Sequence, residues 1–287
     1  MPGFHHILFP VDFSEPSQAI VPFVKRMAQR FEAKVSMVHA VHVFAAAYAP
    51  FGGPTVPAVD ITQMQRDSEQ QMDQFQRAND GSFITACPIG DPAFVLREYA
   101  QENGVDMVMM PTHGHGTFRT MLLGSLTAKL LHDLECPVWT AAHTADPMLQ
   151  QHVECRSIIC AVDLKPESVC VVKHAVELAV GLGAKMQLVH AVPPAMPGPE
   201  SYLDVDYRQA LTKNAQTEIA MLQKRAGTDL EARIEGDEVS KLVRTAAIDR
   251  EADLVIIGRG KLHATLGRLR TQAYSIIRDS PCPVLSL

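Results

Sequence analysis

The chain has 287 residues, which is enough for one large domain or two small ones. Its hydrophobic content of 47% supports a packed core, and no apolar run approaches the roughly 20 residues that a membrane span needs. The formal net charge of −6 argues against a general nucleic-acid-binding protein. The N-terminus has no basic stretch before an apolar one, so we expect no signal peptide, no membrane partner and a cytoplasmic location.

Short apolar segments alternate with helical patterns along the chain. In the first half we expect helices at 15–32, 61–78, 91–103 and 124–134, between strands at 6–11, 34–41, 83–88, 105–110 and 137–142. In the second half we expect strands at 157–162, 185–192, 230–235, 253–258 and 283–287. Strands and helices that alternate at this spacing predict an α/β, Rossmann-like fold with parallel strands and helices on both faces.

The chain contains one structural unit twice. Three segments recur in the same order: Phe9–Asp12 as Cys160–Asp163, Val38–Val41 as Val189–Val192, and Cys136–Val138 as Cys282–Val284. We therefore predict two domains, 1–146 and 152–287, with a polar boundary at 144–153. Each domain is expected to be a doubly wound parallel sheet of five strands in the order 3-2-1-4-5.

The segment 107–142 is the most informative part of the sequence. It is typical of a strand, a glycine-containing loop, a helix and a second strand. Nine residues separate Gly114 from Gly124, and Ser125 begins a helical pattern. A helix start offers unpaired N–H groups and a partial positive charge, and glycine lets the backbone approach an anion closely. The loop is therefore a candidate phosphate site.

A second polar feature is expected to face the same crevice. Asp12 ends the first strand, and the Gly114 loop follows the fourth. In a doubly wound sheet, ligands bind beyond the carboxyl ends of the strands, where the strand order reverses. With the order 3-2-1-4-5, that reversal lies between these two strands.

These motifs resemble the universal stress protein family, with two copies of its domain covering nearly the whole chain. The family's nucleotide motif is glycine, two residues, glycine, nine residues, then glycine followed by serine or threonine. Gly114, Gly124 and Ser125 match the later part, whereas the first glycine is replaced by Pro111. The first strand end, the Val38–Val41 segment and the helix after the loop also match the family pattern.

The resemblance implies ATP, or ADP or AMP, as the ligand of the first domain. Pro10 and Asp12 match family positions at the adenine and ribose end, and the backbone of Ala40 and Val41 matches positions at the base edge. The phosphate positions correspond to Gly114, Gly124, Ser125 and Leu126. The expected set is completed by residues at the strand end and in the loop, namely Met110, Pro111, His113 and His115. Mg²⁺ is a further candidate, since phosphate binding often recruits it, although no second carboxylate lies near the loop in the sequence.

Simpler interpretations of the same residues stay open. Asp12 could only cap the first helix, the glycines could only serve a tight turn, and Ser125 could be an ordinary N-cap. We expect a nucleotide-binding sensor or regulator in the stress response rather than an enzyme. The alternatives are an interaction scaffold that has lost its ligand, with Pro111 as the sign of that loss, and a slow nucleotide hydrolase that uses His113 or His115.

The second copy departs from the motif. Gly114 corresponds to Gly260, but Gly124 and Ser125 correspond to Arg270 and Thr271. We therefore expect the second domain not to bind a nucleoside triphosphate through the backbone of this loop. It could be empty, or its arginines could hold another anion or reach the first domain.

Two further features concern assembly and redox state. The six cysteines include no C-x-x-C pair, so we expect buried free thiols and no metal site. The strands at 137–142 and 283–287 are apolar and are predicted to lie at sheet edges, which favour pairing. We expect the two domains to pair through them within one chain, while a homodimer of whole chains stays open.

Overall fold

A computed structural model of the chain describes residues 3–42, 60–79, 82–113, 123–142, 154–193, 201–259 and 271–287. The chain divides into two compact units, one within 4–136 and the other formed mainly by Pro137–Leu287, with Leu123 counted in the latter. The domain boundary expected at 144–153 lies outside the described residues.

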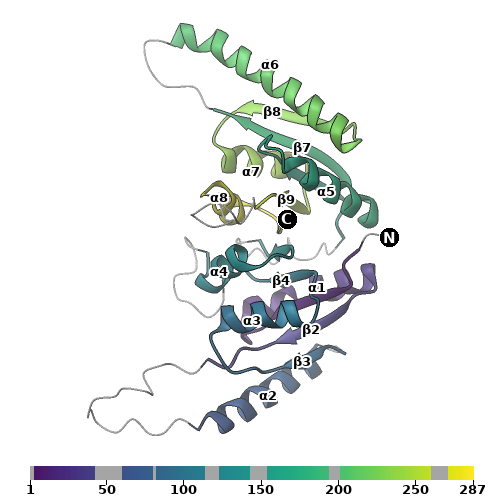
Figure 1. Cartoon of the computed structure of the whole chain (residues 1–287), viewed down its shortest axis with the longest axis vertical. Helices are drawn as coiled ribbons and strands as arrows, with labels where there is room; N and C mark the ends of the chain where they lie inside the picture. Colours follow the sequence, from purple (N-terminus) through teal and green to yellow (C-terminus); the bar gives the residue numbers. More distant parts are fainter. Residues whose placement is uncertain are drawn as a thin grey trace, which may run out of the picture. The chain divides into compact units, whose positions relative to one another are not determined.

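The first half follows the predicted alternation closely (Figure 1). Its elements are β1 His6–Pro10, α1 Glu15–Phe31, β2 Lys34–Val38, α2 Ile61–Ala78, β3 Ile84–Ala86, α3 Pro92–Glu102, β4 Met107–Met110, α4 Ser125–Asp133 and β5 Val138–Thr140.

The second half repeats this sequence of elements. They are β6 Ser157–Ala161, α5 Ser168–Leu182, β7 Lys185–Val192, α6 Ser201–Ala226, β8 Ala232–Gly236, α7 Val239–Asp249, β9 Leu254–Ile257, α8 Thr271–Asp279 and β10 Val284–Ser286.

The strand order within each half is the predicted one, but the prediction of two separate sheets is wrong. The strands form one ten-stranded sheet in the order β3-β2-β1-β4-β5-β10-β9-β6-β7-β8. β5 pairs antiparallel with β10, with Trp139 opposite Leu285, and the other named pairs are parallel. Each of these apolar strands would otherwise expose unpaired N–H and C=O groups, so pairing removes two edges at once.

The central strands are covered on both faces. Successive side chains of a strand point to opposite faces, and every side chain of β1, β4 and β9 is buried. In the second half α5 packs with α6 and α7 packs with α8, while α5 and α7 both contact β6 and β7 (Figure 1). This is the three-layer arrangement expected of a doubly wound sheet.

One aspartate in each half fixes where the first strand begins. The carboxylate of Asp106 accepts the N–H groups of His5 at 2.7 Å and His6 at 3.0 Å. Asp253 accepts those of Arg156 at 2.7 Å and Ser157 at 2.9 Å in the same way. The repeated contact ties the start of β1 to the approach to β4, and the start of β6 to the approach to β9.

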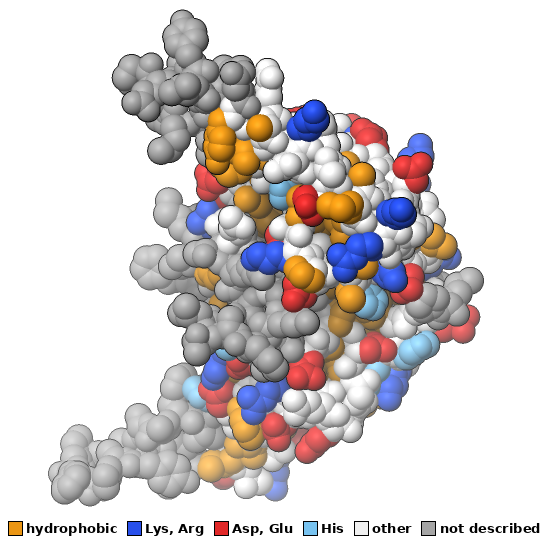
Figure 2. All heavy atoms as spheres, turned by 45° about the horizontal axis from the view of Figure 1, so that its top comes forward, with side chains coloured by type: hydrophobic (Ala, Val, Ile, Leu, Met, Phe, Trp, Pro, Cys, Tyr) orange, Lys and Arg blue, Asp and Glu red, His pale blue; other side chains and the backbone are white. Residues whose placement is uncertain are grey.

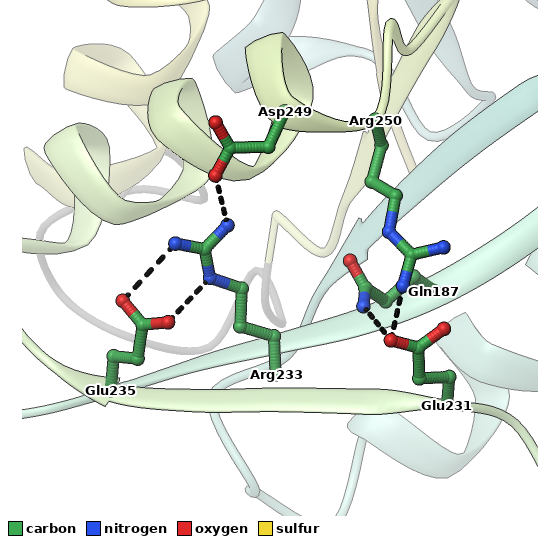
Figure 3. Close-up of polar contacts among 6 residues, drawn as sticks. All are labelled: Gln187, Glu231, Arg233, Glu235, Asp249 and Arg250. Atoms are coloured by element: carbon green, nitrogen blue, oxygen red, sulfur yellow. Dashed lines mark hydrogen bonds and ion pairs between the residues drawn. The ribbon is translucent and has the colours of Figure 1, made fainter.

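The outer strands of the sheet are protected differently. β3 is only three residues long, and a short edge offers little backbone to another chain. The longer β8 carries charged side chains, which Figure 3 shows at close range. Arg233 binds Glu235 through two nitrogens, at 2.7 and 3.2 Å, and Asp249 at 2.7 Å, while Arg250 pairs with Glu231. Such charges oppose pairing with a second sheet edge.

The visible surface carries charges of both signs. Figure 2 shows lysine and arginine side chains interspersed with aspartate and glutamate rather than gathered into one patch. None of the described helices is both long enough and apolar enough to cross a lipid bilayer.

A buried hydrogen-bond network links His6 of β1 to Ser36 of β2 and Tyr99 of α3. His6 is 3% exposed, and its Nδ1 lies 2.9 Å from the carbonyl of Asn103, which can only accept, so Nδ1 carries the proton. Its Nε2 then accepts from the Ser36 hydroxyl at 2.7 Å, and Ser36 accepts from the Tyr99 hydroxyl at 3.0 Å. Burial lowers the pKa of His6 below its ordinary value of 6.5, and nearby Lys34 acts in the same direction.

We predict that this histidine makes the fold less stable in mild acid. Because folding lowers the pKa of His6, the folded state binds fewer protons than the unfolded state, so its contribution is complete above about pH 6.5 and falls as the pH drops towards the folded pKa. Each unit of pKa lowering is worth about 1.4 kcal/mol. Urea titrations between about pH 7.5 and 5.5 should show a shallower pH dependence for His6→Gln than for wild type. His5→Gln, on the exposed neighbour, controls for the loss of one imidazole.

Candidate functional site

The turn after β1 holds Asp12 in a strained backbone. Phe13, the next residue, has φ 61°, a left-handed conformation that costs about 1–2 kcal/mol for a residue with a Cβ. Asp12 Oδ1 accepts from Ser14 N–H at 3.1 Å, Ser14 Oγ at 2.5 Å and Ser17 Oγ at 2.7 Å. Ser14 itself is the N-cap of α1, so Asp12 supports the cap without being it.

His39, which we did not predict as a site residue, stabilises this turn. His39 Nδ1–H donates to the carbonyl of Val11 at 2.8 Å, and its ring lies 4.5 Å from that of Phe13. The Phe13 ring also contacts Phe75 at 5.9 Å. The sequence did hold a signal, because the histidine recurs as His190 in the repeated Val-His-Ala-Val segment.

Ala40 and Val41, the two residues expected at the base edge, point their backbone groups to opposite sides at the end of β2. Val38 C=O accepts from Val11 N–H on the β1 side, whereas His39 N–H donates to Ala86 on the β3 side. Backbone direction alternates along a strand, so the N–H and C=O of Ala40 face the β1 side, where β1 has already ended. No hydrogen bond to the Ala40 backbone is found within the described residues.

Val41 is placed differently from Ala40. Its N–H donates to the carbonyl of Pro88 at 2.8 Å, and its carbonyl accepts from Gly90 N–H at 3.0 Å. Both backbone groups therefore point towards the β3 side. The Val41 backbone is thus bonded on the β3 side, and the contacts expected of Ala40 and Val41 with a base stay predictions.

The end of β4 is tied to the start of α4. Thr112 C=O accepts from Gly124 N–H at 2.8 Å, and Pro111 C=O accepts from Thr127 Oγ1 at 3.2 Å. Met110, Pro111 and Thr112 are all buried. These two hydrogen bonds hold Pro111 and Thr112 next to the start of α4, so the two ends of the loop are fixed relative to each other.

A glycine is needed at position 124 because the backbone there passes close to Thr112 and His113, and not because its φ angle is unusual. Its φ is −55° and it is the N-cap of α4, so the alternative in which Ser125 is the N-cap is wrong. A Cβ at Gly124 would lie 3.1 Å from Thr112 O and 3.3 Å from His113 Cα. The glycine is therefore explained by packing against the end of β4.

The start of α4 keeps donors available for a ligand. Gly124 N–H is used by Thr112, and the first intrahelical bond runs from Ala128 N–H to Gly124 C=O. No side chain caps the helix. The N–H groups of Ser125 and Leu126 consequently have no acceptor within the described residues, and the Ser125 side chain is exposed.

The histidines of the loop are only partly described. His113 is half-buried and its Nδ1 lies 3.1 Å from Thr112 Oγ1. Gly114 and His115 lie outside the described residues, so their predicted contacts stay predictions. Within the described part of the chain, no group of three histidine, cysteine or acidic side chains could hold a metal ion.

The sheet brings the described site residues to one edge. β2, β1 and β4 are neighbouring parallel strands, and their carboxyl ends lead into Ala40, Asp12 and Pro111 respectively. Pro10 is buried at the end of β1. The edge combines a backbone donor and acceptor, a carboxylate and an open helix start, which suits a ligand with a polar heterocycle, hydroxyl groups and an anionic tail.

The second half repeats the first part of this arrangement. Leu164 has φ 57°, Asp163 Oδ1 accepts from Ser168 Oγ at 2.9 Å, and His190 Nδ1–H donates to Val162 C=O at 2.9 Å. Strand pairing also matches Met107 with Leu254, because Ile7 pairs with the former and Ile158 with the latter.

This pairing gives the second half a glycine where the first has proline. Counting on from Met107 and Leu254, Pro111 corresponds to Gly258, so the loop after β9 is one residue shorter than the loop after β4. A Cβ at Gly258 would lie 2.9 Å from Val171 Cγ2. Packing against α5 therefore explains this glycine.

The repeated elements and the strand order define a duplicated α/β protein of the doubly wound class. The sequence model of the universal stress protein family matches residues 3–141 and 154–287. The chain therefore belongs to the universal stress protein family and contains two of its domains in tandem.

Individual relatives agree with this assignment. Universal stress protein A homolog 2 of Coxiella burnetii (strain RSA 493 / Nine Mile phase I) is 27% identical over 123 residues, which cover 42% of this chain and 81% of that protein. A universal stress protein from Archaeoglobus fulgidus DSM 4304 has a similar fold, with a TM-score of 0.67, 17% identity, and coverage of 98% of this chain and 97% of that one. A protein of unknown function from Pseudomonas aeruginosa PAO1 has a TM-score of 0.65 at 16% identity, covering 99% of this chain and 92% of that one.

We predict unequal effects on stability for substitutions at two neighbouring residues. Gly124→Ala should lower the free energy of unfolding by about 1–3 kcal/mol, because the added Cβ presses on the Thr112 carbonyl. Ser125→Ala should change it by less than about 0.5 kcal/mol, because the exposed serine makes no cap bond. Urea denaturation of both variants checks this. An unchanged midpoint for Gly124→Ala would contradict the packing explanation.

Proposed function

We propose that the first domain binds ATP, or ADP or AMP, at the carboxyl edge of β2, β1 and β4, and that nucleotide occupancy makes the chain a sensor or regulator in the stress response. The observation that carries this proposal is the Ala40 backbone beside the Asp12 turn, which has no hydrogen-bond partner among the residues that the structure describes. We place this activity in the cytoplasm; all six cysteines are free thiols, which suits a reducing compartment.

The base and the sugar are assigned to the β2 and β1 end of the edge. One strand residue that presents both N–H and C=O can pair with a heterocycle that offers an acceptor next to an amino donor, as adenine does. Asp12 lies at the end of β1 on this edge, and we assign its carboxylate as the acceptor for a hydroxyl or amino donor, since a carboxylate has about four acceptor sites.

The phosphates are assigned to the start of α4. The N–H groups of Ser125 and Leu126, together with the Ser125 hydroxyl, supply donors near the positive end of the helix. A helix terminus contributes about 0.3–1 kcal/mol per nearby charge, and up to about 2 kcal/mol when partly buried. Binding therefore requires several donors acting together, with the 114–122 loop among the expected contributors.

The residues fit a nucleotide better than they fit a catalytic centre. No pair of nucleophile and base is assembled at the described part of the edge, and Mg²⁺ would have to be held mainly by the phosphates. One contact favours slow hydrolysis as a second candidate: the 3.1 Å approach of His113 Nδ1 to Thr112 Oγ1, which orients the imidazole at the loop entrance. Phosphate release by wild type that His113→Ala abolishes would support that activity.

We predict that ATP stabilises the folded chain. A ligand that binds only the native state at about 100 times its Kd adds about 2.7 kcal/mol. Thermal unfolding with ATP, ADP and AMP should therefore show a raised Tm. Asp12→Asn should weaken binding by about tenfold or more, because it removes a charged acceptor, and Ser125→Ala should weaken ATP more than AMP.

Asp163→Asn, the matched change in the second domain, should leave the affinity of the first domain unchanged. Absence of any Tm shift at millimolar nucleotide would contradict the proposal and favour the scaffold. An equal loss of affinity in Asp12→Asn and Asp163→Asn would contradict the assignment of the site to the first domain.

A further inference from the structure

Helix α6 packs against its own domain through a narrow buried stripe. It lies beside α5 and contacts β7 and β8 (Figure 1). From residue 207 onwards, where its side chains are described, its buried residues are Ala215, Ile219 and Leu222. Their intervals of four and three residues place them on one side of the helix, which is the side turned to the domain. The other faces of this part of α6 belong to the surface of the described chain.

A second stripe on α6 has the spacing of a coiled-coil seam. Its residues recur at alternating intervals of three and four, and each has an exposed side chain: Tyr207, Ala210, Asn214, Thr217, Met221 and Lys224. They take the a and d positions of consecutive heptad repeats. With 3.6 residues per turn, the centre of this stripe lies about 125° around the helix from the buried stripe. A second helix can therefore reach it without displacing the domain.

The composition of this exposed stripe suits a helix partner. Tyr207 and Met221 are large apolar side chains at a positions, and they are 62% and 46% exposed. Asn214 occupies the a position between them, and a single asparagine at a fixes the register of a parallel two-stranded coiled coil. Ala210 and Thr217, at d positions, are small enough to let two helices approach closely. The stripe therefore favours a short, parallel pair of identical helices.

Charged residues of opposite sign flank the stripe on its two sides. Lys213 occupies the g position of one heptad, Glu218 occupies the e position of the next, and both side chains are exposed. In a parallel pair, the g residue of one helix faces the e residue that lies five positions later in the other helix. Lys213 of one copy therefore faces Glu218 of the second copy. The two-fold symmetry of such a dimer forms this ion pair twice, whereas an antiparallel pair would form neither.

We propose that α6 binds a second copy of this chain, α6 against α6, as a short parallel coiled coil. The charge complementarity of Lys213 and Glu218 selects an identical helix as the occupant of the stripe. Only about two heptads are available, and helical pairs of this length are marginal, so the dimer is reversible. The surface lies outside the residues assigned to the nucleotide, and the two proposals can therefore fail separately.

Charge reversal in the full chain tests the pairing. Analytical ultracentrifugation of the wild type over rising concentration should show a reversible equilibrium between monomer and dimer. Lys213→Glu or Glu218→Lys should weaken the dimer by about tenfold, because two attractive contacts become repulsive. The double variant, in which both charges are exchanged, should dimerise like the wild type. Lys173→Glu, at an exposed position of α5, controls for the change in net charge, and the Tm of each variant checks its fold.

Disulfide cross-linking tests the register. In a Cys170→Ser background, which removes an exposed thiol, Met221→Cys places one thiol at an a position of each copy. Diamide, which takes up the two hydrogen atoms lost as the disulfide forms, should convert this variant to a covalent dimer. Gln216→Cys, at an exposed position of α6 away from the stripe, should stay monomeric. In an antiparallel pair centred on the stripe, the two introduced thiols would lie about 16 Å apart along the helices, too far for a disulfide.

Three results would overturn the inference. The first is a wild-type chain that stays monomeric up to about 1 mM, because a dimer weaker than this has no useful affinity. The second is a dimer that neither charge reversal weakens, since the contact would then lie on another surface. The third is a dimer in which Met221→Cys forms no more disulfide than Gln216→Cys, which would contradict the parallel seam. No nucleotide is added in these experiments, so their outcome is independent of the Tm shift predicted for ATP.

Discussion

The site depends on one mismatch between neighbouring parallel strands: β2 continues in an extended conformation after β1 has ended. Val11 makes the last bond of the β1–β2 ladder, through its N–H to Val38, and its carbonyl is then taken by the imidazole of His39. The backbone of Ala40 is left facing an open edge. The left-handed turn at Phe13 carries the chain away from that edge and keeps Asp12 beside it. Without the early end of β1, these polar groups would be used within the sheet.

A comparison of the two copies distinguishes the features that the fold requires from the features that a ligand would require. Both copies retain the aspartate after the first strand, a non-glycine residue with positive φ, and the histidine bond to the preceding carbonyl. A residue keeps a strained backbone conformation only when its surroundings enforce it. Because the strained turn occurs in both copies, at Phe13 and at Leu164, it belongs to the structure of the repeated unit. The copies differ at Ser14 and Lys165, and in the loops that precede α4 and α8. The copies have also diverged away from the crevice, since α1 and the matching segment of α5 share few residues.

The sequence predicted the elements well because their signals are local. Apolar runs and helical periodicity placed most strands within a few residues, and the repeated segments revealed the duplication. The failures involve non-local contacts. The sequence did predict pairing of the strands at 137–142 and 283–287, and β5 pairs with β10, but the expectation of two separate sheets missed that this pairing forms one continuous sheet. The conformation of Phe13 depends on packing between β1 and β2 and gave no signal in the sequence, and the bond of His39 to Val11 was signalled only by the recurrence of the histidine as His190.

The site residues show the same division. Asp12 and Ala40 were identified by resemblance, and their geometry has a physical explanation. The backbone of Val41, by contrast, is bound to Pro88 and Gly90, and Gly124 is fixed by its approach to Thr112. A motif names positions, but it does not distinguish a residue that contacts a ligand from one that shapes the loop.

Amide hydrogen exchange at Ala40, followed by NMR with and without ATP, tests the central claim most directly. The Ala40 N–H, which has no acceptor among the described residues, should exchange at least about tenfold more slowly when ATP is bound, because the base then accepts a hydrogen bond from it. The neighbouring Val41 N–H, already bonded to Pro88, should change little. An Ala40 exchange rate that does not respond to ATP concentrations that raise the Tm would contradict the claim that the unpaired end of β2 receives the base.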